Sequence, residues 1–177
     1  MSEWYPLLAL TLTVFTLLVF VRAAVHKILD FGEFEGFVAD YQLVPDTAVR
    51  PVSTVLLGLE ILIVSFLLIN PLRDGALMLA AGLLMLYGTA IAINLKRGRT
   101  HIECGCGGAP QHLSGTLLWR NLTLTILALL PLFASRHALT LAESTVSIAA
   151  GMSLWLLYAL FEQANANLMA LTAKRNL

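Results

Sequence analysis

The sequence predicts an all-α integral membrane protein with about five transmembrane helices, built on a four-helix-bundle core. Of the 177 residues, 58% are apolar and only 12% are charged, whereas charged residues make up about a quarter of a typical soluble domain. The charges are clustered, which leaves apolar runs long enough to cross the roughly 30 Å hydrocarbon core of a bilayer. Such runs are expected to be helical because backbone polar groups in lipid must be bonded internally. A formal net charge of zero gives no reason to expect a nucleic-acid partner.

Five apolar segments define the predicted spans, at about residues 4–21, 52–70, 75–95, 116–134 and 139–161. Trp4 and Tyr5 stand where interfacial aromatic residues are common, and Pro51 suits the start of the second helix. Only residues 71–74 separate the second and third segments, and only residues 135–138 separate the fourth and fifth. Each of these pairs is therefore predicted to be an antiparallel hairpin. The N-terminal residues lack the basic region of a signal peptide, so the first segment is expected to remain as a helix.

Two longer connections are predicted to lie at the same membrane face. In the first, residues 31–44 place aromatic and aliphatic side chains at roughly helical spacing, with acidic residues between them. This pattern predicts an amphipathic helix that covers the mouth of the bundle. The second connection, residues 96–115, carries the only two cysteines of the chain. With no internal repeat, residues 1–177 are interpreted as a single transmembrane helical-bundle domain.

Cys104 and Cys106, separated by Gly105, are the candidate catalytic residues. A disulfide across one intervening residue closes a very tight ring, and strained, accessible disulfides are the easily reduced kind. The adjacent glycines permit the unusual backbone dihedrals that such a ring needs. Basic residues nearby would favour the thiolate, whereas Glu103 would oppose it. The pattern favours a redox pair over a purely structural bridge, because closing so short a loop constrains the unfolded chain little.

Two alternatives to redox chemistry stay open. His101, Cys104, Cys106 and His112 together offer the sulfur and nitrogen donors of a tetrahedral metal site, although the one-residue cysteine spacing is tighter than usual. In the other alternative, the protein is a membrane scaffold and the cysteine pair is a structural clip. We rank the metal site clearly behind redox chemistry.

Polar residues inside the spans form a second group of candidates, with structural or relay roles. Glu60 lies in the middle of the second span, and an ionisable residue at that depth is a functional hypothesis by default. Its expected partner is Arg120 or Asn94, in an ion pair or hydrogen bond that fixes helix register. Arg120 and Asn121 are alternatively an interfacial anchor. Lys27, beyond the first span, is expected at a solvated helix end.

Four features resemble a known family: Arg22-x4-Lys27-x3-Phe31, the Tyr41-Gln42-Leu43-Val44-Pro45 turn, Glu60, and Cys104-Gly105-Cys106-Gly107-Gly108 followed by Leu118-Trp119-Arg120-Asn121. Their order and spacing are similar to the methylamine utilisation protein E (MauE) family, within the DoxX-like membrane proteins, over nearly the whole chain. The resemblance implies a thiol–disulfide oxidoreductase, an oxidase or isomerase, that helps to mature the β subunit of periplasmic methylamine dehydrogenase. It also implies a thioredoxin-like MauD-type protein as the partner.

The layout also resembles the vitamin K epoxide reductase bundle, in which a cysteine pair lies at the mouth of the fourth helix. That likeness implies a membrane quinone as the electron acceptor for Cys104 and Cys106. This chain departs from it in having one residue between the cysteines and no cysteine pair in the first long connection. Any relay of electrons would therefore need a partner protein.

Two considerations conflict over membrane orientation. Basic residues are concentrated on the side of the two long connections: Arg22, Lys27, Arg50, Lys96, Arg97, Arg99, Lys174 and Arg175, against Arg73 and Arg136 on the other side. The positive-inside rule would place the cysteines in the cytoplasm. Disulfides, however, persist in oxidising compartments, and the family resemblance implies a periplasmic cysteine loop in the bacterial inner membrane. We adopt the periplasmic orientation.

Overall fold

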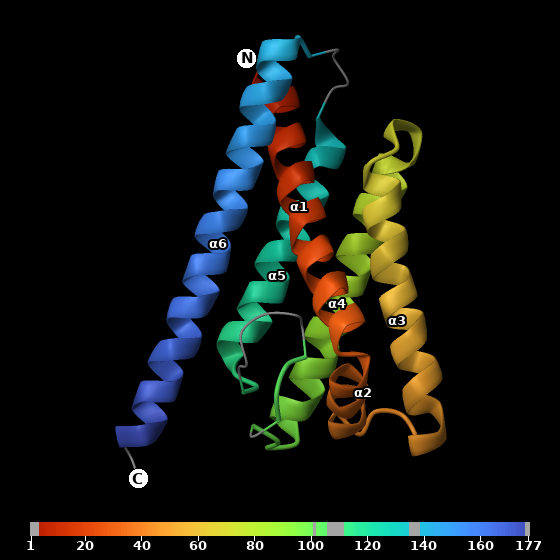
Figure 1. Ribbon diagram of the computed structural model, residues 1–177, viewed down its shortest axis with the longest axis vertical. Coiled ribbons are helices and arrows are strands. Elements are labelled where there is room, and N and C mark those ends of the chain that lie inside the picture. Colours follow the sequence, from red (N-terminus) through yellow and green to blue (C-terminus); the bar gives the residue numbers. More distant parts are fainter. Residues whose placement is uncertain (1–3, 101, 106–111, 135–138, 176–177) are drawn as a thin grey trace.

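A computed structural model describes residues 4–100, 102–105, 112–134 and 139–175 (Figure 1). The described chain is helical, and its elements are α1 (Trp4–Leu29), α2 (Phe31–Asp40), α3 (Asp46–Leu67), η1 (Asn70–Leu72), α4 (Arg73–Lys96), α5 (Gly115–Leu129), η2 (Leu130–Phe133) and α6 (Leu141–Arg175). The elements η1 and η2 are short 3-10 helices that begin or end a longer helix. The side chains of α6 are described as far as Leu168.

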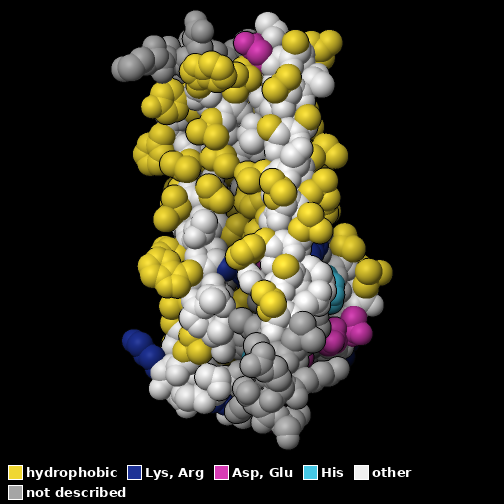
Figure 2. All heavy atoms as spheres, turned by 90° about the vertical axis from the view of Figure 1, so that its left-hand side faces the viewer, with side chains coloured by type: hydrophobic (Ala, Val, Ile, Leu, Met, Phe, Trp, Pro, Cys, Tyr) yellow, Lys and Arg dark blue, Asp and Glu magenta, His cyan; other side chains and the backbone are white. Residues whose placement is uncertain are grey.

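Within the described residues, five helical segments are long and apolar enough to cross a membrane, namely α1, α3, η1 with α4, α5 with η2, and α6. Figure 2 shows hydrophobic side chains over most of one face between its two ends, with charged side chains mainly toward the ends. These observations confirm the predicted all-α fold of a multi-pass membrane protein. Lipid-facing hydrophobic side chains stay exposed in such a fold, because the bilayer rather than the protein covers them.

The helices differ from the predicted spans mainly in where they begin and end. The first continues beyond residue 21 to Leu29, and the last continues beyond residue 161 to Arg175. Helix α3, which corresponds to the predicted second span, begins at Asp46, directly after Pro45 in an extended conformation. Pro51 therefore lies inside this helix and does not begin it. Pro45 is the better start signal because Asp46 then places a negative charge in the first turn, where the helix dipole favours it. Pro51 is the sixth residue of this helix, and its missing N–H removes one helical hydrogen bond.

The bundle is organised around α1 and α4. Helix α1 packs against α3 and α6, and α4 packs against α3 and α5. The largest group of buried side chains lies among these helices and includes Phe15, Phe20, Ile63, Leu67 and Leu77. Burial of such side chains specifies which helix faces meet, while close helix approach supplies the packing contacts that hold helices together in lipid.

Gly151 permits a close approach between α6 and α1. A Cβ atom added at Gly151 of α6 would lie 2.7 Å from the carbonyl oxygen of Thr11 in α1, a distance that would force the helices apart. At Gly88 an added Cβ would make ordinary contact with Asn121 of α5, at 3.5 Å. Gly58 and Gly82 have no atom within 4 Å of this position, so close helix packing does not require glycine at either place.

Helix α2 lies at the end of the bundle that also carries the segment between α4 and α5 (Figure 1). Asp30 caps this helix, because its carboxylate accepts a hydrogen bond from the backbone N–H of Glu33 at 2.9 Å. At the other end, the Arg97 guanidinium donates to the carbonyl of Gln42 at 3.3 Å. The two long connections therefore meet at one face, as the sequence predicts, and the cysteine segment packs against α2.

Candidate functional site: a cysteine at the bundle mouth

The backbone on either side of the cysteine loop is held by a short two-stranded contact. Glu103 and His112 form an isolated antiparallel bridge, and the N–H of Leu113 donates to the carbonyl of Ile102 at 3.0 Å. Leu113 is buried with Ile91 and Leu117, and Cys104 packs at the edge of this apolar cluster. The apolar cluster therefore fixes the first cysteine relative to α4 and α5.

Helix α2 holds Cys104 from the other side. The Tyr41 hydroxyl donates a hydrogen bond to the Cys104 carbonyl at 3.1 Å. Gly105 has φ +64°, and an added Cβ would lie 2.7 Å from the Phe37 ring. Glycine is therefore required at this position both by the backbone conformation and by the close approach of α2. Burial raises the pKa of Tyr41 to about 12, against the opposing influence of the Arg120 charge.

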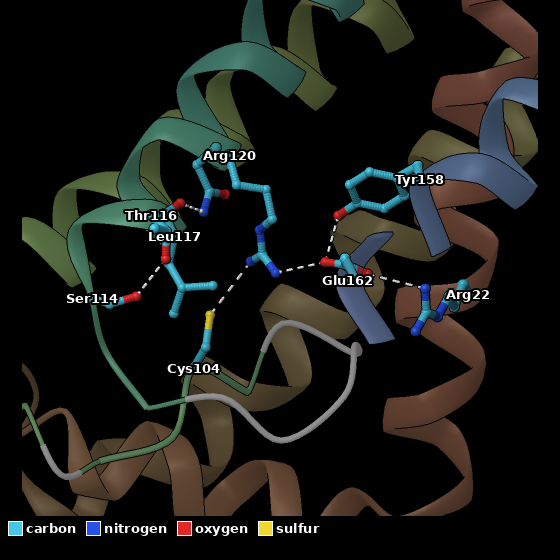
Figure 3. Close-up of polar contacts among 9 residues, drawn as sticks. Arg22, Cys104, Ser114, Thr116, Leu117, Arg120, Tyr158 and Glu162 are labelled. Atoms are coloured by element: carbon cyan, nitrogen blue, oxygen red, sulfur yellow. Dashed lines mark hydrogen bonds and ion pairs between the residues drawn. The ribbon is translucent and has the colours of Figure 1, made fainter. Parts of the chain in front are cut away.

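The sulfur of Cys104 faces an arginine from α5. The Nη2 atom of Arg120 lies 3.5 Å from Cys104 Sγ, and its Nη1 atom donates to Glu162 Oε1 of α6 at 2.8 Å. The same carboxylate accepts from Arg22 Nη1 of α1 at 3.0 Å and from the Tyr158 hydroxyl at 2.6 Å. Figure 3 shows these side chains converging from three helices on Glu162, with Arg120 between the carboxylate and the sulfur.

The described residues place only part of the predicted cysteine and histidine set. Cys104 is disulfide-bonded, and Cys106, the only other cysteine in the chain, lies outside the described residues, as does His101. His112 is exposed. Within the described ranges, no three His, Cys, Asp or Glu side chains are grouped as metal ligands would be. The catalytic role of the cysteine pair stays a prediction.

Glu60 does not pair with Arg120 or Asn94, so this part of the prediction was wrong. Its Oε1 atom accepts hydrogen bonds from Lys27 Nζ at 2.5 Å and from the Tyr87 hydroxyl at 2.8 Å. The Lys27 and Glu60 side chains are 2% and 0% exposed, so Lys27 is not at a solvated helix end. The reason is that α1 continues past the predicted end at residue 21, so that Lys27 lies in the helix and faces the interior of the bundle.

A sequence signal for the burial of Lys27 was present. Phe20, Ala23, Ala24 and Lys27 are all buried in α1, and their spacing is that of one helix face. The Lys27 ammonium also lies 4.8 Å from the centre of the Phe34 ring and 5.4 Å from that of Tyr87. The pair therefore links α1, α3 and α4 and contacts α2 through a cation–π interaction.

Asn94 of α4 and Asn121 of α5 are buried polar residues, and Asn121 lies against Gly88 of α4. Both are buried, and each donates to a carbonyl in its own helix, Asn94 to Ala90 at 3.2 Å and Asn121 to Leu117 at 2.9 Å. Asn121 is therefore a buried polar residue of the helix contact rather than an interfacial anchor. Arg120, its neighbour, turns its guanidinium toward Cys104 and Glu162.

Sequence reasoning missed Glu162, together with Arg22 and Tyr158 as its partners. The predicted fifth span ended at residue 161, which placed the carboxylate just outside the membrane helix. Tyr158 and Glu162 are four residues apart, a spacing that places them side by side on a helix. This spacing was the available signal, but nothing local indicates that α1 and α5 supply two arginines to the same carboxylate.

An apolar cavity of about 460 Å³ lies between α2, α3 and α4 and reaches the cysteine segment. Residues of α2 and of the turn after it form one wall, and α3 and α4 form the other. Its lining is Phe34, Phe37, Val38, Tyr41, Leu43, Val44, Val52, Leu56, Leu86, Tyr87, Thr89, Ala90, Ile93, Cys104 and Gly105.

The fold and this geometry define the class: a multi-pass helical membrane protein with a cysteine site at the mouth of its bundle. Residues 5–134 match the family model described as methylamine utilisation protein MauE, and the chain belongs to this family. It is 38% identical over 157 residues to the MauE protein of Paracoccus denitrificans, covering 86% of this chain and 84% of that one. It is 37% identical over 148 residues to the MauE protein of Methylophilus methylotrophus, covering 84% and 77%. No solved structure matches the chain significantly.

Proposed function

We propose that this protein is a membrane thiol–disulfide redox protein that helps to mature the β subunit of methylamine dehydrogenase, acting with a thioredoxin-like MauD-type partner. Family membership supports a role in methylamine utilisation. The observation that carries the redox part is a disulfide-bonded Cys104 at the bundle mouth, with a guanidinium 3.5 Å from its sulfur. A cation at this distance favours a thiolate, which is the species formed whenever the disulfide opens.

In the proposed reaction, a thiolate of the client attacks one sulfur of the Cys104–Cys106 disulfide. The S–S bond breaks, a mixed disulfide forms, and the other sulfur leaves as a thiolate. A second client thiolate then attacks the client sulfur of the mixed disulfide, which forms the client disulfide and releases the reduced pair. The client loses two electrons and two protons, and the disulfide of the thioredoxin-like partner reoxidises the pair by the same exchange in reverse.

A lipid-soluble quinone is an alternative acceptor implied by the likeness to vitamin K epoxide reductase. The apolar cavity beside Cys104 fits such a group, because its walls are aromatic and aliphatic and it ends at the cysteine segment. Phe37 of α2, Tyr41 just after it and Ile93 of α4 would hold the ring and exclude water. When bound, a quinone would supply an acceptor for two electrons and two protons.

The cysteine loop is proposed to face the periplasm across the bacterial inner membrane. A disulfide that faced a reducing cytoplasm would be reduced again, and a client that matures in the periplasm could not reach it. The test is labelling of intact cells with a membrane-impermeant maleimide. Labelling of Cys104 and Cys106 only after mild reduction supports the periplasmic site, and labelling only after the inner membrane is opened would refute it.

Client maturation tests the redox function directly. Cys104→Ser and Cys106→Ser are each expected to stop formation of active methylamine dehydrogenase while the membrane protein still accumulates. His112→Ala is the matched control, because His112 is exposed at the base of the same loop and only the metal alternative needs its ring. Normal maturation in the double serine variant would instead support the scaffold function.

A further inference from the structure

We propose that Arg120 is the counter-cation that selects Cys104 as the sulfur that leaves when the disulfide opens, and that Glu162 limits how much of that charge the sulfur receives. The client thiolate then attacks Cys106, and the mixed disulfide forms there. This inference rests on the proposed exchange function and assigns a different role in the exchange to each of the two cysteines. Arg120 acts as a positioning residue, because its charge works through the sulfur of Cys104.

The guanidinium of Arg120 is shared between two acceptors. Nη1 donates to Glu162 at 2.8 Å and Nη2 points to the sulfur at 3.5 Å, as Figure 3 shows. The Arg120 side chain is 16% exposed and that of Glu162 is 6% exposed, so water screens the cluster weakly. Electrostatic effects are larger under these conditions than at an open surface.

The charges of the cluster do not cancel. Among the described residues, Arg22 and Arg120 both pair with the carboxylate of Glu162, so in these three side chains two positive charges meet one negative charge, and the Tyr158 hydroxyl donates a hydrogen bond. The formal sum is one positive charge, next to the sulfur. A Cys104 thiolate would neutralise it, whereas a bonded disulfide sulfur is uncharged. The cluster is therefore better matched to the opened state than to the disulfide.

The field of Arg120 reaches other groups of the cysteine segment. Its charge acts to lower the pKa of Tyr41, whose hydroxyl donates to the Cys104 carbonyl. Among the described residues of 96–115, the other ionisable groups are Lys96, Arg97, Arg99, Glu103 and His112. Glu103, which precedes Cys104, is half-buried, and His112 is exposed across the bridge. Glu103 and Glu162 oppose a thiolate, and Arg120 is a cation in contact with the sulfur.

The chemical consequence concerns the leaving group. In thiol–disulfide exchange, the sulfur with the lower thiol pKa leaves faster. As the S–S bond breaks, negative charge develops on Cys104 Sγ, and the bond from Nη2 becomes a charge-assisted hydrogen bond. Cys106 then holds the client until the second client thiolate releases it. Electrons and atoms balance as in the reaction above, and no further oxidant is needed.

The test measures the rate of alkylation of each cysteine against pH in the reduced, detergent-solubilised protein. Iodoacetamide is the probe, and fragment masses of the peptide that holds both cysteines separate Cys104 from Cys106. In the natural protein, Cys104 should reach half its maximal rate at a lower pH than Cys106. Arg120→Gln should raise the Cys104 midpoint by about 1–3 pH units and move that of Cys106 much less.

Two further variants separate electrostatics from loss of structure. Glu162→Gln removes the same ion pair between α5 and α6 as Arg120→Gln. It should nevertheless lower the pH at which Cys104 reaches half its maximal alkylation rate, because the opposing negative charge is removed. Arg120→Lys keeps the charge and should restore part of the shift. Arg22→Gln is the matched control: it removes a partner of Glu162 without touching the sulfur, and should raise the midpoint less than Arg120→Gln.

Equal Cys104 midpoints in the natural protein and Arg120→Gln, or shifts of the same sign in Arg120→Gln and Glu162→Gln, would overturn the inference. The alkylation assay contains no client, so its outcome is independent of the proposed maturation function. Normal maturation without either cysteine would refute that function and leave the measured midpoints intact. If maturation needs both cysteines but the alkylation midpoints are unchanged in Arg120→Gln, only this inference is refuted.

Discussion

Replacing Lys27 by Met is expected to destabilise the bundle severely, because it leaves Glu60 buried without its cation. The two side chains are 2% and 0% exposed, and their charged atoms are 2.5 Å apart. Glu60 Oε2 already has no hydrogen-bond partner among the described residues, so after the substitution only the Tyr87 hydroxyl would contact the carboxylate. Removing one partner of a buried ion pair typically costs about 3–5 kcal/mol, and we expect a loss of this size.

The double variant Lys27→Met/Glu60→Gln separates a lost contact from a stranded charge. Met keeps apolar atoms near the Phe34 and Tyr87 rings, and the Gln side-chain carbonyl can still accept from Tyr87. Replacing both charges of a buried pair is often neutral or stabilising, so we expect the double variant to recover most of the loss. The Arg50–Glu35 pair is the control, because Arg50 is 84% exposed and the atoms are 3.6 Å apart. Arg50→Met should cost about 0–1 kcal/mol.

The assay is reversible unfolding of the purified protein in mixed micelles, followed by circular dichroism, which gives a free energy of unfolding for each variant. A double-mutant cycle then gives the coupling energy between Lys27 and Glu60. The reasoning is refuted if Lys27→Met costs no more than Arg50→Met, or if the double variant is as unstable as Lys27→Met alone. Either result would mean that the carboxylate is neutral or hydrated in the native bundle.

Four further substitutions test two close approaches, with one control, and the hydrogen bond that Tyr41 donates. Gly105→Ala should cost about 1–2 kcal/mol of stability for its positive φ, in addition to the clash of the new Cβ atom with Phe37 at 2.7 Å. Faster hydrogen exchange of the cysteine segment would show this loss, and unchanged exchange would contradict it. Gly151→Ala should lower the melting temperature because of its contact with α1, whereas Gly58→Ala, with no atom within 4 Å, should be neutral or slightly stabilising; equal effects would argue against the crossing. Tyr41→Phe should cost about 0.5–1.5 kcal/mol and remove one tyrosine titrating near pH 12 from the alkaline absorbance curve. Because burial raises this pKa, its contribution to stability is complete below pH 10 and is lost as pH rises toward 12.

Hydropathy predicted the number of spans and the class of fold because a membrane helix requires a long apolar run, which is a local property of the chain. Helix ends were less well predicted, since α1 and α6 continue past their apolar runs into the site. Lys27 and Glu162 look like residues outside the membrane by local composition. Both are tolerated inside because a partner from another helix completes each pair, and that partner cannot be read from local sequence.

The cysteine segment was identified from sequence, but its surroundings were not. The spacing of Cys104 and Cys106, with glycine between, indicated chemistry at one point of the chain. The residues around Cys104 come from elsewhere in the chain: Tyr41, just after α2, donates to its carbonyl, Arg120 of α5 contacts its sulfur, and Glu162 of α6 holds Arg120. Arg120 was expected to pair with Glu60 and instead pairs with Glu162, because the basic and acidic residues of a bundle can pair in several ways that hydropathy does not rank.

The two buried carboxylates show how similar residues serve different ends. Glu60, deepest in its span, was the obvious functional candidate, yet it meets one ammonium and one hydroxyl, and its formal charge is cancelled by Lys27. That pair joins α1 to α3 and α4 and holds Phe34 of α2 over the bundle. Glu162 meets two guanidinium groups, and the positive charge left over faces Cys104. Glu60 thus serves the packing of the bundle, whereas the effect proposed at the sulfur depends on the charge that Glu162 leaves unbalanced.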